Sequence, residues 1–334
     1  MTTVLSMETC NKRIRYNYID RLKGLAITLV VIGHLILWCY EDNNNGVFIF
    51  VNSVHMPLFM FLSGVVINIP PTSRRWIVLL FRFLCPFLII GGLLSLFDGR
   101  GLLKLFTSHH KCGYWYLYIL SLFYSFLYLR GLLKVKETKK NLVLDIVFFL
   151  VLYAAFWVLD KNMTSSTNDL IGIGLCRLYW PYFYLGYLVN RYNLMRFVIN
   201  YGYTVGLLIL LPCSYFFVNG VVHLSNIVAL SFIYVLLYLF RERENCFTFI
   251  DNYLQTIGKS SIDVYIYHYF FHRFISFPVV GVYLLETNNI LFFVLLLFVV
   301  SILIIQLCLI VGIIIKKSFV LDNIVYGRIV NRWI

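Results

Sequence analysis

Long apolar runs alternate with short polar breaks along the chain. A helix needs about 20 apolar residues to cross a hydrocarbon core of about 30 Å, and ten runs approach that length. The predicted spans are residues 23–40, 47–69, 76–97, 114–133, 141–159, 171–190, 201–219, 223–240, 260–283 and 289–315. These runs are too long and too continuous for the alternating strands of a membrane barrel. The pattern therefore predicts an all-α integral membrane protein, built as a single bundle of about ten transmembrane helices.

The polar breaks leave no room for a second domain. The longest of them, near residues 98–113 and 241–259, are too short to fold alone. No internal repeat is evident, and the first residues contain no short apolar stretch followed by a cleavage site, so we expect no signal peptide. We therefore expect one transmembrane domain over residues 1–334.

Composition agrees with this pattern. Hydrophobic residues make up 61% of the chain and charged residues 13%, whereas a soluble domain usually has about a quarter of its residues charged. A soluble dinucleotide-binding enzyme, a disordered chain and a secreted disulfide scaffold are excluded. The eight cysteines are scattered without a CxxC pair, and we interpret them as small buried hydrophobes.

The net charge of +13 is a feature of topology and does not indicate a nucleic-acid partner. If the ten spans alternate across the membrane, 22 of the 28 Lys and Arg residues lie on the side of the N-terminus and two lie inside spans. The four on the opposite side are Arg100, Lys104, Lys111 and Lys161. Because cytoplasmic loops collect positive charge, both termini are predicted to be cytoplasmic.

A short set of ionisable residues lies inside the predicted spans, where such groups are costly and often functional. The set comprises His34, His55, Asp145, Arg177, Asp263, His268, His272 and Arg273. Three spans each place a histidine near the middle of the bilayer. A lone membrane histidine is often a hydrogen-bonded packing residue, but imidazole is also the commonest general base. His268 and His272 share a helical face, yet no carboxylate or cysteine joins them in a ligand pattern, so no metal is expected.

Lys23 and His34 are eleven residues apart and therefore lie on one face of the first span, separated by roughly 16 Å along the helix axis. A lysine at the cytoplasmic mouth and a histidine deep inside are expected to line one groove. The alternative for Lys23 is an interfacial lysine whose ammonium group reaches the membrane surface.

Six sequence segments, in order, resemble the signature of acyltransferase family 3, whose members O-acylate bacterial surface glycans and related molecules. The segments are IDRLKGLAITLVVIGH from Ile19, HMPLFMFLSG from His55, RFLCP from Arg82, YWYL from Tyr114, PYFYLGYL from Pro181 and GKSSIDVYIYH from Gly258. The resemblance covers roughly residues 18–270. One departure is Lys23, which stands where the family usually has arginine and cannot make arginine's bidentate contacts.

The resemblance implies an O-acyltransferase, most simply an acetyltransferase that uses acetyl-CoA and acts on a hydroxyl of a cell-surface glycan or lipid-linked sugar. It also implies the stand-alone form of the family, in the bacterial cytoplasmic membrane. His34 is the expected base, assisted by Lys23. Residues expected near the acceptor or acyl donor are His55, Ser63, Arg82, Tyr265 and His268. Cations expected to hold the donor's phosphates are Arg74, Arg75 and Lys259.

Two alternatives belong to other classes. A flippase or transporter for glycolipid or polysaccharide precursors also carries histidine and arginine in its cavity, but the sequence shows no inverted repeat or paired broken helices. A purely structural membrane scaffold leaves the buried histidines unexplained.

Overall fold

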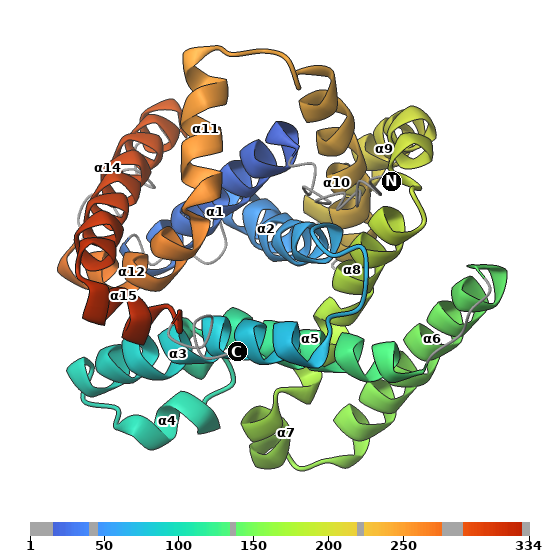
Figure 1. Cartoon of the computed structure of the whole chain (residues 1–334). Coiled ribbons are helices and arrows are strands. Elements are labelled where there is room, and N and C mark those ends of the chain that lie inside the picture. Colours follow the sequence, from blue (N-terminus) through green and yellow to red (C-terminus); the bar gives the residue numbers. More distant parts are fainter. Residues whose placement is uncertain (1–15, 40–45, 134–137, 219–223, 276–289, 329–334) are drawn as a thin grey trace, which may run out of the picture.

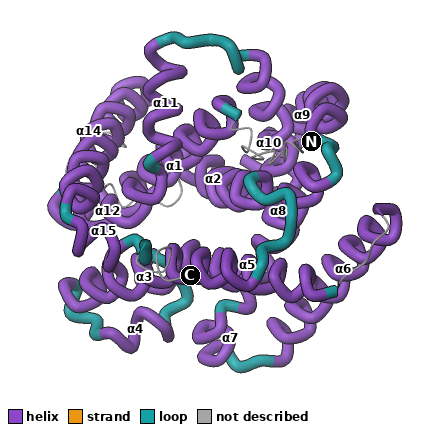
Figure 2. The backbone as a smooth tube through the Cα atoms, viewed as in Figure 1, coloured by secondary structure: helices purple, strands orange, loops and turns teal. Residues whose placement is uncertain are grey.

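The computed structural model describes residues 16–39, 46–133, 138–218, 224–275 and 290–328, and no strand occurs in these ranges (Figure 2). The helices are α1 (Asn17–Cys39), α2 (Gly46–Val65), α3 (Ser73–Phe97), α4 (Leu102–Thr107), a 3-10 turn η1 (Lys111–Gly113), α5 (Trp115–Leu132), α6 (Thr138–Asn162), α7 (Ser165–Ile171), α8 (Ile173–Arg191), α9 (Met195–Val218), α10 (Ser225–Glu242), α11 (Phe249–Lys259), α12 (Ser261–Phe274), α14 (Ile290–Lys317) and α15 (Phe319–Val325). The all-α prediction is confirmed for the described residues.

Each of the ten predicted spans overlaps a helix, but the count of ten is not confirmed. By length and composition, six helices within the described ranges could cross a membrane, namely α2, α3, α6, α9, α10 and α14. Helix α12 is described over only 14 residues, and the rest of the predicted span 260–283 lies outside the described ranges, apart from Ile275. The two long polar breaks, for which no helix was predicted, contain short helices: α4 and η1 in one and α11 in the other.

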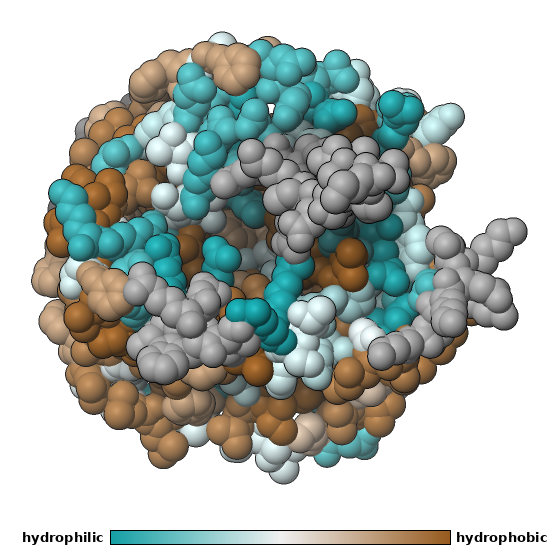
Figure 3. Space-filling model, in the orientation of Figure 1, coloured by the Kyte–Doolittle hydropathy of each residue, from teal (hydrophilic) through white to brown (hydrophobic). Residues whose placement is uncertain are grey.

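Apolar side chains cover much of the outer surface. Helices α6 and α9 are long and apolar, yet most of their residues are not buried against the rest of the protein, and α6 lies at the edge of the bundle in Figure 1. In Figure 3, hydrophobic residues gather around the periphery of the visible face, whereas hydrophilic residues lie towards its centre and upper part. This distribution fits an apolar belt that faces lipid.

Two helix crossings are close enough to require glycine. A Cβ atom added at Gly64 of α2 would overlap the Phe183 carbonyl of α8, and one added at Gly186 of α8 would overlap the Phe61 carbonyl of α2. Helices α1 and α11 meet in the same way through Gly24. Small residues let the backbones of membrane helices approach, and here they bring α8 and α11 against the two helices that carry His34 and His55.

A buried acidic group outside these crossings is neutralised by ion pairs. Asp145 of α6 is fully buried and pairs with Arg130 of α5 and, at 2.9 Å, with Arg191 of α8. The hydroxyl groups of Tyr184 and Tyr192 also donate to its carboxylate, at 3.3 and 2.5 Å. We call these five residues the Asp145 cluster. Because a buried charge without a partner is costly, the cluster ties α5, α6 and α8 together.

A second ionic cluster joins α1 to the start of α11. The buried Arg21 guanidinium donates to the carbonyls of Arg243 and Cys246 and lies 3.7 Å from the Asp251 carboxylate. Asp251 also accepts from Arg243 at 2.7 Å and closes a capping box with Thr248 at the start of α11. The N-terminal end of α1 is thereby fixed to α11.

Candidate functional site

A cavity of about 1000 Å³ reaches His34 from one end of the bundle. Its walls come from the C-terminal halves of α1 and α12, the N-terminal halves of α2, α8 and α10, the residue Arg100 after α3, and the turn between α4 and α5. All of these parts belong to the end of the bundle away from the N-terminus of α1. The cavity therefore opens at the end opposite to the one that carries Lys23.

His34 is held by a tyrosine at the cavity wall. Its Nε2 atom lies 3.1 Å from the hydroxyl oxygen of Tyr269, and that hydroxyl donates its one hydrogen to the Gly113 carbonyl at 2.9 Å. The hydroxyl of Tyr265, one helical turn earlier on α12, donates to the same carbonyl at 2.8 Å. A carbonyl oxygen can accept twice, so Gly113 orients both tyrosines and, through Tyr269, the imidazole of His34.

Two further histidines of α12 surround the ring of His34. The ring centroids of His268 and His272 lie 5.3 and 6.2 Å from that of His34. The Nδ1 atom of His268 lies 3.0 Å from the Val264 carbonyl, while its Nε2 atom is buried without a hydrogen-bond partner among the described residues. Because a carbonyl can only accept, Nδ1 carries the hydrogen and the neutral ring presents a lone pair at Nε2.

His55 has the same tautomer and lines the cavity directly. Its Nδ1 atom lies 2.6 Å from the Val51 carbonyl, one turn earlier on α2. The carbonyl again fixes the hydrogen on Nδ1, which leaves Nε2 as an acceptor. His34 and His55 thus come from two helices to one cavity.

Aromatic and amide side chains form another wall. Trp115 and Tyr179 stack with ring centroids 4.7 Å apart, and the Tyr182 hydroxyl donates to the Asn226 side chain at 2.8 Å. All four residues line the cavity. A pocket with aromatic rings and a few fixed polar groups suits a ligand that has apolar ring faces as well as hydroxyl groups.

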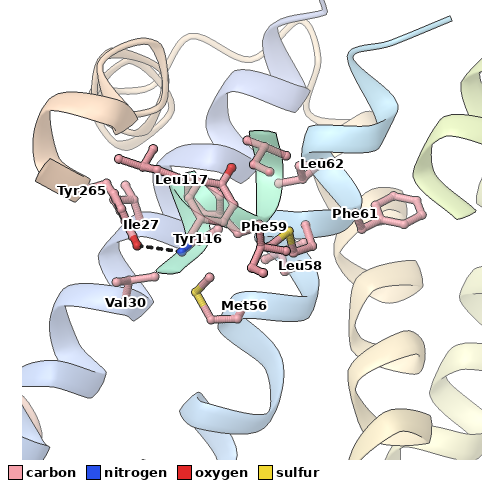
Figure 4. Packing of buried hydrophobic residues seen from close by; sticks show 14 of the residues in the cluster. Ile27, Val30, Met56, Leu58, Phe59, Phe61, Leu62, Tyr116, Leu117 and Tyr265 are labelled. Atoms are coloured by element: carbon pink, nitrogen blue, oxygen red, sulfur yellow. Dashed lines mark hydrogen bonds between the residues drawn. The ribbon is translucent and has the colours of Figure 1, made fainter. Parts of the chain in front are cut away.

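Ser63 and Tyr265 are connected through a residue that sequence analysis did not single out. The Ser63 hydroxyl lies 2.7 Å from the hydroxyl of Tyr116, and the backbone amide of Tyr116 donates to the Tyr265 hydroxyl at 3.3 Å. Figure 4 shows this bond beside Met56 and Phe59, with Phe61 turned to another side of α2. Tyr116 is thus part of the buried packing that adjoins the wall of the cavity.

The predicted donor-binding cations lie away from the cavity. Arg74 and Arg75 begin α3, Arg82 follows two turns later, and Lys259 ends α11. Arg74, Arg82 and Lys259 are exposed. Neither these residues nor Lys23, all within the described ranges, line the cavity. The cavity therefore does not form the single groove expected to contain Lys23 and His34. Val30 lines the cavity beside His34, but Ile27, which comes next on the stripe towards Lys23, is buried and does not line it.

Of the predicted site residues, His34, His55 and Tyr265 line the cavity. His268 does not line it, but its ring packs beside that of His34. Sequence analysis missed Tyr269, Gly113 and the Trp115–Tyr179 pair. The i, i+4 spacing of Tyr265 and Tyr269 was an available signal, since it places both on one helical face. No sequence signal brings Gly113 to that face.

No group of three or more His, Cys, Asp and Glu side chains among the described residues is arranged to hold a metal ion. The apolar helices and the histidine-lined internal cavity are those of a membrane protein with a ligand site inside its helical bundle. A family model described as an acyltransferase domain, that of acyltransferase family 3, matches residues 16–310. The chain belongs to this family and is an acyltransferase. No curated protein and no solved structure shows significant similarity to it.

Proposed function

We propose that the protein transfers an acetyl group from acetyl-CoA to a hydroxyl group of a cell-surface glycan or lipid-linked sugar that enters the cavity. The observation that carries this proposal is that His34 lines the same cavity as the stacked Trp115 and Tyr179. Aromatic faces suit the apolar faces of sugar rings, and Asn226 and Tyr182 offer polar groups for their hydroxyls. Family membership favours acyl transfer over the transporter alternative.

The chemistry assigned to His34 is that of a general base. The sugar hydroxyl attacks the thioester carbonyl, its proton passes to the imidazole of His34, the carbon–sulfur bond breaks, and the proton is returned to the departing thiolate. A positioned base contributes about 10²- to 10⁴-fold to such a step. Tyr269 orients the ring through the 3.1 Å contact at Nε2.

His55 and His268 take accepting roles in this proposal. Their Nδ1 hydrogens are directed at backbone carbonyls, so the neutral rings have only a lone pair left. His55, which lines the cavity, accepts a hydrogen bond from a sugar hydroxyl and orients it. His268 lies behind His34 and supports the position of its ring. Ser63 and Tyr265 keep the wall between the cavity and the neighbouring helices in place.

The donor is assigned to the opposite end of the bundle. Arg75 and Arg82 lie seven residues apart and so share one face of α3, and both lie close enough to Tyr124 of α5 to act on it electrostatically. Guanidinium groups suit the phosphates of coenzyme A. Arg74, Lys259 and Lys23 add positive charge at this end, which faces the cytoplasm if the protein lies in the bacterial cytoplasmic membrane with both termini inside.

The test is acetyl transfer from radiolabelled acetyl-CoA by membrane vesicles that contain the protein, with the glycan analysed by mass spectrometry. A His34→Ala variant should lose transfer by about 10²-fold or more. Thr28→Ala is the matched control, because Thr28 is a buried residue of the same helix whose hydroxyl donates to the Gly24 carbonyl one turn earlier, and it should keep full activity. Equal transfer by the two variants would refute the role of His34, and vesicles that leave no acetyl group on the glycan would refute the reaction.

A further inference from the structure

Positive side chains cluster at the mouth of the cavity. Arg100, after α3, and Arg273, near the end of α12, both line it, together with His109 and His110. None of the residues that line the cavity, within the described part of the chain, is an aspartate or glutamate. The walls near His34 are aromatic and imidazole groups, so charge is concentrated at the opening.

One carboxylate is shared by the two arginines. The Asp98 Oδ2 atom lies 2.7 Å from Arg273 and 3.3 Å from Arg100. The Asp98 side chain is 8% exposed, whereas those of Arg100 and Arg273 are 45% and 32% exposed. The carboxylate therefore lies behind the guanidinium groups, and these three side chains together carry a surplus of one positive charge.

The two histidines add little to this surplus. His109 pairs with Asp169 at 2.7 Å, so its charge is balanced when it is protonated. Burial, and to a smaller extent the neighbouring His109, lowers the pKa of His110, which therefore stays neutral near pH 7. Among the described residues that line the mouth, the lasting positive charge is that of the arginines, whose planar groups match phosphate and carboxylate oxygens.

Topology does not account for these arginines. Positive residues are expected mainly on the cytoplasmic side, and the cavity mouth lies at the other end of the bundle, where the sequence places few cations. A structural role accounts for Lys111 at this end, since its ammonium group is fully buried and donates to the carbonyls of Phe106, Asp169 and Leu170. Arg100 is nearly half exposed and faces the opening instead.

We propose that the acceptor saccharide carries an anionic group, a phosphate or a carboxylate, which Arg100 and Arg273 bind at the cavity mouth while a hydroxyl of the sugar lies at His34. This inference rests on the proposed function, since it names the class of acceptor for the same cavity. It makes the mouth a specificity site and assigns the chemistry of transfer to the residues deeper inside.

The test compares three ligands that differ in charge: methyl glucoside, methyl glucuronide and glucose 1-phosphate. Binding is measured by NMR titration of the full chain in nanodiscs of phosphatidylcholine, a lipid whose headgroup carries no net charge. We expect at least one of the anionic sugars to bind about tenfold more tightly than methyl glucoside, the size of a charge-assisted contact. A preference for glucuronide indicates a sugar acid as acceptor, and a preference for glucose 1-phosphate indicates a phosphate-linked sugar.

An Arg100→Gln variant should lose most of that preference and bind methyl glucoside as the unmodified chain does. Its fold is protected because the Arg273–Asp98 pair remains. Lys104→Gln is the matched control, since Lys104 is an exposed cation of the nearby α4 that does not line the cavity. Equal binding of all three sugars, or a preference that survives in Arg100→Gln, would overturn the proposal.

Acetyl transfer, measured in parallel, separates this inference from the proposed function. If anionic sugars bind through Arg100 but no labelled acetyl group reaches any acceptor in the vesicles, the site stands and the reaction is wrong. If acetyl transfer depends on His34 while Arg100→Gln leaves the choice between charged and neutral sugars unchanged, the reaction stands and the anionic acceptor is wrong.

Discussion

The His34 cavity and the Asp145 cluster use buried polar groups in opposite ways. In the cluster, two arginines and two tyrosine hydroxyls surround one carboxylate, and these contacts fill the space around it. At the cavity, imidazoles and tyrosines bond to backbone carbonyls such as those of Gly113 and Val51, and they border open space. A neutral ring held by a carbonyl can still exchange a proton with a ligand, whereas a charge held by several partners mainly holds helices together.

The difference shows why an ionisable residue within a membrane helix is not by itself a functional signal. From the sequence alone, Asp145, His34 and His55 are equally good candidates for a functional role, since each is an ionisable residue within a predicted membrane span. Their partners separate them: Asp145 is neutralised by residues of other helices, and the two histidines line a cavity. Changes in the cluster should therefore affect folding, and changes at the cavity should affect catalysis.

The largest expected effect on folding follows from Asp145→Ala. Removal of the carboxylate leaves Arg130 and Arg191 without their shared partner inside the protein, which should cost about 3–5 kcal/mol of the free energy of unfolding. Asp160→Ala, on the same helix, is the matched control, because Asp160 pairs at 2.6 Å with the half-exposed Arg177 and such pairs contribute about 1 kcal/mol or less. Thermal unfolding in detergent measures both. Equal losses would show that the cluster is not a special support of the fold.

A smaller loss of stability is expected where α2 and α8 cross, between the cavity and the cluster. In Gly186→Ala the new methyl group overlaps the Phe61 carbonyl, and the backbones must separate, at a cost of about 1–3 kcal/mol. Gly202→Ala on α9 is the control, because its methyl group would lie 3.4 Å from the Tyr234 side chain, and alanine favours the helix by up to about 1 kcal/mol. If both variants unfold at the same temperature, the close approach of α2 and α8 is unimportant for stability.

A selective loss of catalysis is expected from Tyr269→Phe. The variant loses the hydroxyl between His34 and Gly113, so the base is less well oriented and kcat should fall about tenfold, with KM unchanged and about 1 kcal/mol of stability lost. Tyr238→Phe is the control, since Tyr238 stacks on Tyr203 in α9 and does not line the cavity. An unchanged kcat in Tyr269→Phe would mean that the hydroxyl serves packing alone.

The smallest effect concerns pH and the ionic cluster of α11. Hydrogen bonds from Arg243 are the main cause that lowers the pKa of Asp251 from 3.8 to about 2. The stability that this carboxylate contributes is therefore complete above about pH 4 and is lost as the pH falls towards 2, by roughly 1 kcal/mol for a partly solvated pair. Asp251→Asn should flatten the dependence of unfolding temperature on pH in this window. An unaltered slope would show that other carboxylates govern acid unfolding.

Much of the helical architecture could be predicted because hydrophobic periodicity and run length are local properties. All ten predicted spans overlap helices. The short helices α4 and α11 were not predicted, because polar segments at a membrane surface lack a long apolar run. The count of spans was the weaker prediction, since buried helices such as α8 carry polar and aromatic residues that lower their apolar character.

The candidate site was only half predictable for a physical reason. His34, His55 and Tyr265 could be singled out because a polar group inside an apolar span is visible in the sequence alone. Gly113 and Arg100 could not, since each lies in a short connection and acquires its role from α12, more than 150 residues later in the chain. Lys23 was grouped with His34 because helical geometry predicts a shared face, but it does not predict that Ile27, which lies between them on that face, is buried in the core.

The sequence by itself therefore determined the class of the protein, its helices and the identity of the deep histidines, because apolar runs and family motifs are local features of the sequence. Only the tertiary structure decided that the cavity reaches His34 from the end away from Lys23, that Asp145 is structural, and that Asp98 leaves two arginines facing the cavity mouth. Each of these depends on contacts between distant helices, whose packing no local pattern encodes.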